Sequence, residues 1–230
     1  MRIDEYLLDR AVGERALRPV LRIYRWLGPT LSVGAHQRLS DELLARCRSR
    51  GVAVVRRPTG GSAVLHGKDL TYAVVAPHRG LGVLETYREV AGALIDGLAR
   101  LGIDARVGTR RDRAAGGQSA PAPGQACFAT TLGADLQAGD AKICGSAQVR
   151  RRGWFLQHGS IPLGDDRQLT GRLLRHAGSN NSTCIDCLLP GTSPLEVTAG
   201  LVEGFTSRWG EARETELEEL TMSLEPAASG

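Results

Sequence analysis

One stretch of the chain, residues 127–163, contains most of the side chains that can carry out covalent chemistry. Its candidates are a cysteine, a lysine, a run of small residues and a histidine: Cys127, Lys142, Gly145, Ser146, Ala147 and His158. A thiolate is the reactive form of cysteine, and a nearby ammonium lowers the pKa of a thiol and so enriches that form. If the fold brings Cys127 and Lys142 together, the pair predicts a nucleophilic site. The alternative is that Cys127 is a small buried apolar residue, as isolated cysteines often are.

Lysine is scarce in this chain. Of 29 basic residues only Lys68 and Lys142 are lysine, and the rest are arginine. An ammonium is compact and its charge is adjustable, whereas a guanidinium is planar and always charged. Lys142 therefore indicates either a site that needs an amine or a chance survivor of an arginine-biased composition, and composition alone does not separate the two.

A second candidate site is the segment 56–66, which reads RRPTGGSAVLH. Paired glycines after a strand let a ligand approach exposed backbone N–H groups, and an arginine can hold a carboxylate or phosphate. A glycine hairpin with solvated arginines is the simpler alternative, which the arginine and histidine make less favourable. The candidate binding residues here are Arg57, Gly60, Gly61, Ser62, Ala63, Val64, Leu65 and His66.

The remaining cysteines predict packing rather than chemistry. An odd count of five in a chain without an export signal favours reduced thiols. Cys184 and Cys187 have zinc-ligand or redox spacing, but no second pair of ligands accompanies them and no βαβ unit is predicted beside them. We therefore expect a helical segment with both thiols on one face, no metal site, and buried roles for Cys47 and Cys144.

Composition describes an ordinary globular protein. Hydrophobic residues make up 42% and charged residues 23% of 230 positions, with no run of 18 apolar residues and no apolar segment in the first ten. We therefore expect a cytoplasmic protein without a membrane span or secretory signal. The net charge is +4, which suits nucleic acid, membrane headgroups or an acidic protein partner. The arginine runs at 110–113 and 150–152 lack interleaved aromatics, which argues against nucleic acid, and attraction to an acidic carrier protein is at least as good a use of the charge.

Periodicity predicts the elements that must position these residues. We expect helices over 3–12, 41–50, 83–101 and much of the chain after 165, with a capping box at Ser193. Strands are expected over 21–26, 31–34, 52–59, 63–65, 70–75, 103–107, 129–137, 141–150 and 154–163, the first two across the turn at 28–29 and the last three as a meander. Residues 108–126 lack periodicity and predict a mobile cover over Cys127. The order predicts an α+β fold, a mixed, mostly antiparallel β-sheet flanked by helices, in a single domain over 1–230.

Three segments together resemble the biotin/lipoate protein ligase and lipoyl/octanoyl transferase superfamily. They are IYRW…TLSVGAHQ, RRPTGGSAVLHGKDLTYAVV and KICGSAQVRRRGWFLQHGSIPL, in the family's order, and the likeness runs from about residue 4 to about residue 210. It implies that the second and third segments line one tunnel for a lipoyl or octanoyl chain. Three departures are Ser62, where glycine or arginine is usual, the run after Cys127-Phe128, which lacks the expected aromatic residue, and the missing strand before the first helix, which implies a start further upstream.

Within that superfamily the chain is most similar to the cysteine-dependent octanoyl-[acyl-carrier-protein]:protein N-octanoyltransferases. The resemblance implies that Cys127 carries the acyl group and Lys142 activates it, with octanoyl-acyl carrier protein as donor and a lysine of a lipoyl domain or glycine-cleavage H protein as acceptor. It implies a monomer with no C-terminal accessory domain and no cofactor. Three alternatives remain: an ATP- and Mg²⁺-dependent lipoate ligase, an amidotransferase that takes the acyl group from H protein, and a non-catalytic binder of lipoyl domains.

Overall fold

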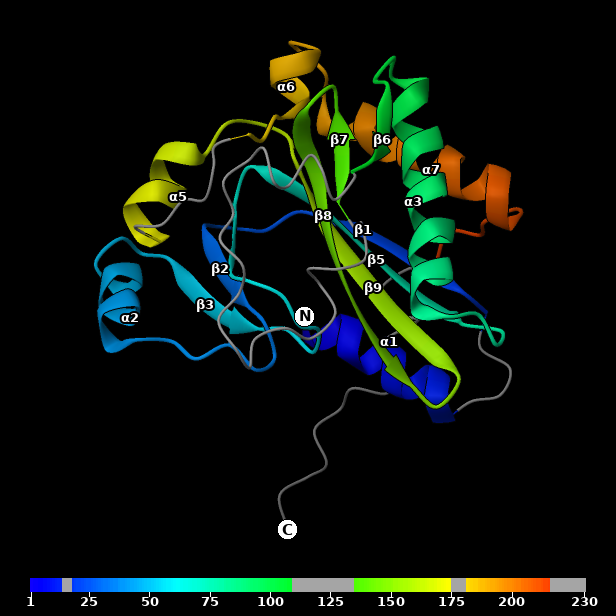
Figure 1. Ribbon diagram of the computed structural model, residues 1–230, viewed down its shortest axis with the longest axis horizontal. Coiled ribbons are helices and arrows are strands. Elements are labelled where there is room, and N and C mark those ends of the chain that lie inside the picture. The colour runs from blue at the N-terminus through cyan, green and yellow to red at the C-terminus, as the bar shows by residue number, and fades with distance from the viewer. Residues whose placement is uncertain (14–17, 109–134, 175–180, 216–230) are drawn as a thin grey trace.

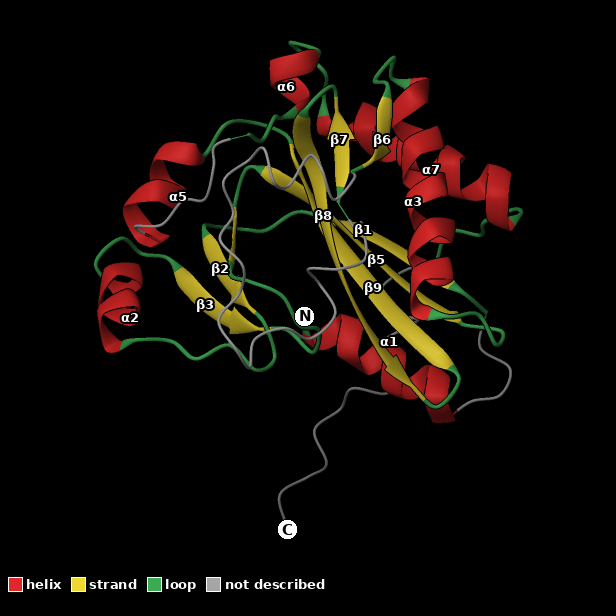
Figure 2. Ribbon diagram, in the orientation of Figure 1, coloured by secondary structure: helices red, strands yellow, loops and turns green. Residues whose placement is uncertain are grey.

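The computed structural model describes residues 1–13, 18–108, 135–174 and 181–215. Cys127 and nearly all of the expected cover loop therefore lie outside the described residues. A large sheet has the strand order β1-β5-β9-β8-β7-β6, and a small sheet has the order β3-β2-β4 (Figures 1 and 2). Every pairing in the large sheet is antiparallel, and β2–β3 in the small sheet is parallel, so the predicted mixed, mostly antiparallel α+β fold is confirmed.

The strands of the large sheet are β1 (Val20–Tyr24), β5 (Asp69–Pro77), β6 (Ala105–Val107), β7 (Leu136–Ala138), β8 (Ala141–Arg151) and β9 (Trp154–Pro162). The small sheet contains β2 (Thr30–Val33), β3 (Ala53–Arg56) and β4 (Val64–His66). The helices are α1 (Arg2–Gly13), α2 (Asp41–Arg48), α3 (Val83–Arg100), α5 (Arg167–Leu174), α6 (Ile185–Leu188) and α7 (Pro194–Trp209). The meander β7-β8-β9 turns at Gly139 and Gly153, as predicted, and both glycines have positive φ. Most of its first expected strand, 129–137, lies outside the described residues.

Local capping chemistry explains several helix boundaries. The Ser40 side chain accepts a hydrogen bond from the Leu43 N–H at the start of α2, and Ser193 and Glu196 form the predicted capping box of α7. The apolar spacing in α7 predicts a core stripe of Leu201, Val202, Phe205 and Trp209, and this is wrong for Val202, which is 36% exposed while Leu201 and Phe205 are buried.

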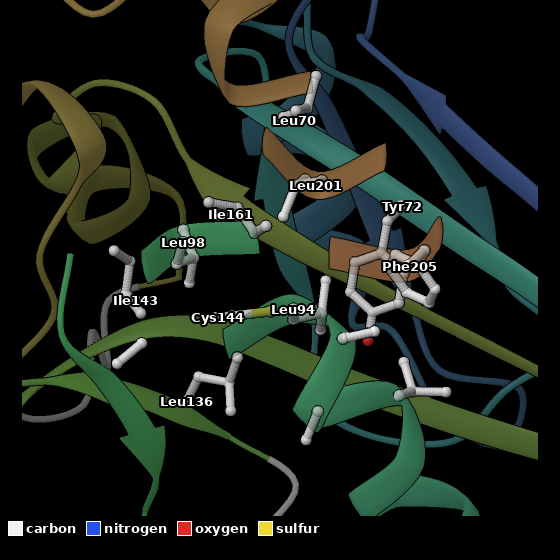
Figure 3. Close-up of a cluster of buried hydrophobic side chains, with 14 of the residues drawn as sticks. Leu70, Tyr72, Leu94, Leu98, Leu136, Ile143, Cys144, Ile161, Leu201 and Phe205 are labelled. Carbon is white, nitrogen blue, oxygen red and sulfur yellow. The ribbon is translucent and has the colours of Figure 1, made fainter. Parts of the chain in front are cut away.

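The main core lies between one face of the large sheet and helices α3 and α7 (Figure 3). Tyr72, Ile161 and Cys144 project from three strands toward Leu94 and Leu98 of α3. The two helices touch through glycine: a Cβ on Gly204 of α7 would lie 2.3 Å from the Ala93 carbonyl oxygen.

The opposite face of the large sheet is covered by two different units. Helix α1 packs Leu7 and Leu8 against Ala73, Val75 and Leu156. The small sheet, with its own core against α2 and α5, lies beside the rest of that face. The strands expected over 21–26 and 31–34, across one turn, correspond to β1 and β2, which belong to different sheets, so the turn crosses from one layer to the other.

Candidate functional site

The side chains that face the small sheet come from three adjacent strands of the large sheet. Strand alternation places Asp69 and Thr71 of β5 on this face, and the register pairs Thr71 with Ser160 and Ala73 with His158 of β9. On β8, Gly145 lies opposite Ser160 and Ala147 opposite His158, so both small residues share the face. The pairing of β8 with β9 therefore brings together three predicted site residues: Gly145, Ala147 and His158.

A β-bulge adds Lys142 to that face. The register between β7 and β8 shifts, pairing Gln137 with Lys142 and Leu136 with Cys144, so Ile143 is the extra residue. Ile143 and Cys144 are consequently both buried in the main core, whereas Lys142 is turned outward. Regular alternation would place Lys142 on the Cys144 face, so the bulge puts the amine on the same face as Gly145.

The Lys142 amine is held between Asp135 and the backbone of its own strand. Its Nζ lies 3.1 Å from Asp135 Oδ2, with the lysine side chain 45% exposed. A Cβ on Gly145 would lie 2.9 Å from Nζ and 3.0 Å from Cε, so the lysine occupies the space that a larger residue would fill. The Gly108 N–H donates to the Asp135 carbonyl at 2.9 Å, so the two ends of the segment that carries Cys127 meet beside Lys142.

Arg57 organises the glycine loop. Its guanidinium donates five hydrogen bonds, to the Gly60 and Ser62 carbonyls and to the carbonyl and hydroxyl of Ser32, at 2.7–3.2 Å. Burial lowers the pKa of Arg57 to about 10, which still leaves it charged at neutral pH. Arg57 thus fixes the loop at 57–62, in place of the free anion-binding arginine that the sequence suggests.

Only one of the paired glycines is required by the backbone. Gly61 has φ of +91°, and a Cβ on Gly34 would lie 2.2 Å from the Gly61 carbonyl oxygen, so the loop packs directly on residues 34–35. Gly60 has open space where a Cβ would be. Val64 of β4 is 37% exposed, whereas Leu65 and the preceding Ala63 pack into the core of the small sheet and do not line the site with their side chains.

His66 lies at the centre of a buried polar network. Its Nε2 is 2.8 Å from Ser32 Oγ and its Nδ1 is 2.7 Å from Asp69 Oδ2, while Trp26 stacks on the ring at 4.4 Å. Asp69 also accepts hydrogen bonds from Ser160, Thr71 and the Gly67 N–H. Burial alone would raise the pKa of the Asp69 carboxyl, but the hydrogen bonds from His66, Ser160 and Gly67 outweigh it and lower that pKa.

His158 links the glycine loop to the first helix. Its Nε2 lies 2.6 Å from Thr59 Oγ1, and its Nδ1 lies 3.9 Å from Asp4 Oδ2 without a hydrogen-bond partner. Burial lowers the pKa of His158 despite the opposing attraction of Asp4, so the ring is neutral at pH 7. Burial would raise the pKa of the Asp4 carboxyl, but the charged N-terminus at 3.7 Å and the Arg22 guanidinium at 2.6 Å help to lower that pKa to about 2.

Sequence reasoning missed the partners in these networks: Asp4, Trp26, Ser32, Thr59, Asp69 and Ser160. Only Asp69 carried a signal, an acid three positions after His66. The predicted site residue Ser146 points to the opposite face, where its hydroxyl is 2.7 Å from the Tyr72 hydroxyl, so only its backbone can serve the site.

Four of the five cysteines are accounted for. Cys47 and Cys144 are free but buried, and burial raises the pKa of Cys144 to about 12. Cys184 and Cys187 form a disulfide, so the expectation of reduced thiols was wrong for this pair, although Ile185–Leu188 is helical as predicted. Neither free thiol in the described part of the chain is in a reactive environment.

The described residues contain no cluster of metal-binding side chains and no helix long and apolar enough to cross a membrane. The basic run at 150–152 is largely engaged within the protein. Arg150 donates to the carbonyls of Leu81 and Gly82, and Arg151 pairs with Asp9 and Glu5.

Comparison with known proteins agrees with this architecture. The chain is similar to octanoyltransferase LipM of Symbiobacterium thermophilum, with 43% identity over 180 residues, which is 76% of this chain and 64% of that protein. LipM of Carboxydothermus hydrogenoformans is 36% identical over 213 residues, 90% of this chain and 74% of that protein. The match thus spans less than two thirds of the first relative's length.

Solved structures give the same result. A lipoate-protein ligase A bound with ATP superposes with a TM-score of 0.78 and 25% identity, covering 96% of this chain and 85% of that one. A T. acidophilum protein with bound lipoic acid gives 0.75 and 25%, covering 97% and 87%. Residues 1–189 match the family described as the lipoyl protein ligase A/B catalytic domain. With the fold, the site segments and this match in agreement, the chain belongs to the lipoyl protein ligase A/B catalytic domain family.

Proposed function

We propose that the protein is an octanoyltransferase that passes an acyl group through a thioester on Cys127 to a lysine of an acceptor protein. The observation that carries the proposal is the placement of Lys142. The bulge at Ile143 sets its amine beside the two ends of the segment containing Cys127, and the other four cysteines are buried or disulfide-bonded. The similarity to proteins named octanoyltransferase LipM supports the acyl group chosen.

The reaction proceeds in two steps. The Lys142 ammonium favours the thiolate of Cys127, which attacks the thioester of octanoyl-acyl carrier protein and releases the carrier thiol. The lysine amine of a lipoyl domain or glycine-cleavage H protein then attacks the acyl-enzyme and forms an amide. A thioester is already activated, so neither step needs ATP. Backbone N–H groups near Gly145–Ala147, beside the Lys142 amine, are suited to stabilise the oxyanion of each intermediate.

The remaining residues shape the site around that chemistry. Arg57 and Thr59 hold the glycine loop against the small sheet and His158, and Val64 offers an apolar, partly exposed side chain on the His66 face. We place the reaction in the cytoplasm, where acyl carrier proteins and lipoyl domains are substrates, with the enzyme acting as a monomer.

Intact mass measurement tests the proposal. Incubation with octanoyl-acyl carrier protein should add one octanoyl group, and peptide mapping should locate it at Cys127. Cys127→Ala should form no adduct, while Cys144→Ala, which removes a buried thiol of raised pKa, should form it normally. An adduct that survives Cys127→Ala, or no adduct on the unmodified chain, contradicts the proposal.

A second candidate is an ATP-dependent lipoate ligase, because the similar lipoate-protein ligase A was solved with ATP. The same experiment separates the two. A ligase would form an acyl-adenylate from ATP, Mg²⁺ and free lipoate or octanoate, and Cys127→Ala would retain that activity. Acyl transfer from octanoyl-H protein, but not from the carrier protein, would instead identify an amidotransferase.

A further inference from the structure

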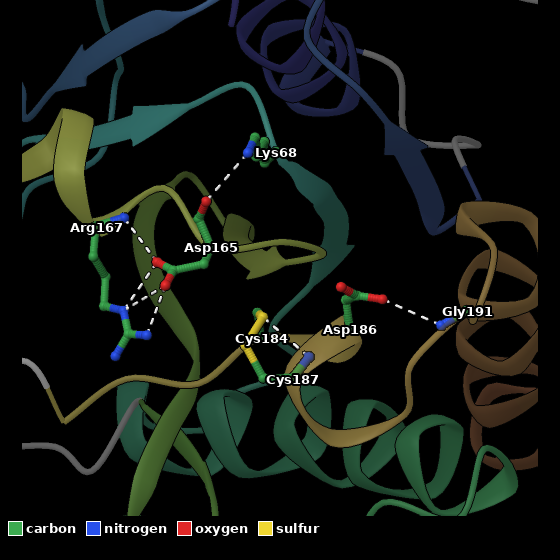
Figure 4. Close-up of a disulfide and its surroundings, with 7 residues drawn as sticks. All are labelled: Lys68, Asp165, Arg167, Cys184, Asp186, Cys187 and Gly191. Atoms are coloured by element: carbon green, nitrogen blue, oxygen red, sulfur yellow. Dashed lines mark hydrogen bonds and ion pairs between the residues drawn. A yellow bond between two sulfur atoms is a disulfide. The ribbon is translucent and has the colours of Figure 1, made fainter.

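The disulfide between Cys184 and Cys187 lies at the start of the short helix α6 (Figure 4). Cys184 is the N-cap residue of that helix, and Ile185 directly after it is fully buried in the main core. The Asp186 N–H donates to the Leu163 carbonyl at 3.0 Å, which ties the turn to the chain just beyond β9. The disulfide therefore closes a turn that is anchored in the core on one side.

The residues just before the disulfide pair with the backbone of Lys142. The Lys142 N–H donates to the Asn181 carbonyl at 2.9 Å, and the Thr183 N–H donates to the Lys142 carbonyl at 2.9 Å. Ser182 forms a parallel bridge with Lys142, and the Asn181 side chain donates to the Asp140 carbonyl at 2.6 Å. The backbone N–H and carbonyl of Lys142 are thus both hydrogen-bonded to the segment 181–183, which directly precedes Cys184.

The two sulfurs differ in how they meet solvent. Cys187 is exposed, whereas Cys184 is only 3% exposed. A notch lined by Pro162, Asp166 and Ser182 reaches both cysteines. The Cys187 N–H donates to Cys184 Sγ at 3.2 Å, which favours negative charge on that sulfur and makes it the better leaving group.

We propose that Cys184–Cys187 is a thiol–disulfide exchange site that dithiols reduce, and that its redox state controls the backbone position of Lys142. Disulfides in a reducing compartment are generally transient or redox-sensing. When the bond is intact, the turn at 184–187 holds residues 181–183 against β8. When it is open, a helix of four residues loses its covalent closure, and the pairing with Lys142 weakens. The effect on acyl transfer rests on the proposed function, whereas the exchange chemistry does not.

The reduction balances as two displacements at sulfur. One thiolate of the dithiol attacks Cys187 Sγ, the disulfide breaks, and Cys184 leaves as a thiolate that takes up a proton. The second thiolate of the reagent then attacks the reagent sulfur that is bonded to Cys187. Cys187 leaves as a thiolate and takes up a proton, and the reagent closes into a cyclic disulfide. Two electrons pass from the dithiol to the protein, and an oxidant such as a small-molecule disulfide reverses the reaction.

Alkylation and hydrogen exchange test the proposal without any acyl donor. The full chain is treated with dithiothreitol or with a phosphine, alkylated and peptide-mapped. Both reagents should make Cys184 and Cys187 alkylatable, and neither residue should react in the oxidised protein. Backbone amide exchange of Lys142 and Thr183 should become at least severalfold faster on reduction, while amides in the β5–β9 ladder stay protected.

The variant Cys187→Ser reproduces the open state without a reductant and changes only an exposed residue. Its Lys142 and Thr183 amides should exchange as in the reduced protein, and adding a reductant should have no further effect on them. Its octanoyl transfer rate should be severalfold below that of the oxidised chain, measured without thiols because these cleave thioesters.

Labelling of Cys184 and Cys187 before reduction, or failure of both reagents to expose them, overturns the exchange site. Unchanged exchange of the Lys142 and Thr183 amides in reduced protein and in Cys187→Ser overturns the coupling. If the oxidised chain transfers no acyl group from any donor, the proposed function fails, while labelling and amide exchange still decide this inference.

Discussion

Replacing Gly145 by alanine should separate the position of the Lys142 amine from the stability of the fold. The added Cβ would lie 2.9 Å from Nζ and 3.0 Å from Cε of Lys142, and 3.7 Å from Asp135 Oδ1. The atoms in conflict belong to the far end of a flexible side chain, so the lysine moves and the strand does not. Its ion pair with Asp135, 3.1 Å long, breaks or lengthens as a result.

The two effects differ in size. Gly145 is not among the residues with positive φ, so alanine fits its backbone, and the free energy of unfolding should change by less than about 1 kcal/mol. A catalytic group displaced by about 1 Å costs on the order of 100-fold in rate. Since the expected shift is somewhat smaller, kcat/KM should fall roughly 10- to 100-fold, equivalent to about 1.4–2.7 kcal/mol of transition-state stabilisation.

The assay is single-turnover acylation of the enzyme by octanoyl-acyl carrier protein, followed by mass spectrometry, together with urea unfolding. Gly164→Ala is a matched control, because its Cβ would make only an ordinary contact, 3.6 Å from Lys68 Cδ. It should keep both rate and stability. If Gly145→Ala acylates within twofold of the unmodified rate, Lys142 does not act from the position described. A loss of stability as large as the loss of activity would likewise refute the reasoning.

Three further outcomes are expected. Gly159→Ala should lower the free energy of unfolding by roughly 3 kcal/mol in urea titrations, because its Cβ would meet the Tyr72 ring at 2.5 Å and a backbone oxygen at 2.6 Å. Unchanged stability would show that the strands move apart at no cost. Burial lowers the pKa of His158, so the folded state binds fewer protons than the unfolded state, and the free energy of unfolding should fall as pH drops below about 6.5. In unfolding measurements from about pH 5 to about pH 8, this fall should be shallower in His158→Gln than in the unmodified protein. Equal pH slopes in the two proteins would contradict this. The Cys144 thiol, buried and with its pKa raised to about 12, should resist iodoacetamide in the native protein at pH 8, whereas rapid labelling would mean that the strand opens.

Much of the fold follows from local patterns. The helices at 2–13, 41–48 and 83–100 and the meander of β7, β8 and β9 were predicted from periodicity, caps and turn glycines, all of which depend on neighbours within a few positions. The strand pairing did not follow. The segments 20–24 and 30–33 have the same pattern whether they pair with each other or enter different sheets, so only their distant partners β5 and β4 decide.

The candidate site divides in the same way. Sequence pattern singled out Lys142, Gly145, Ala147, His158 and the loop 56–66, and the structure places these segments on facing elements. The sequence did not predict that the Arg57 guanidinium donates its hydrogen bonds to the loop, because a guanidinium that binds an anion and one that binds carbonyls look alike in a sequence. Cys127 remains a prediction from the sequence and the resemblance.

What the sequence determined by itself is therefore the inventory of reactive groups and the periodic elements that carry them, because both are encoded by residue type and short spacing. What only the tertiary structure decided is geometry that depends on partners far along the chain. The bulge that turns Lys142 away from the core arises in its register with β7. The links from His66 to Ser32 and from His158 to Thr59 span 34 and 99 positions. Such contacts form only when whole layers pack, because a buried polar group must find a hydrogen-bond partner wherever the fold provides one.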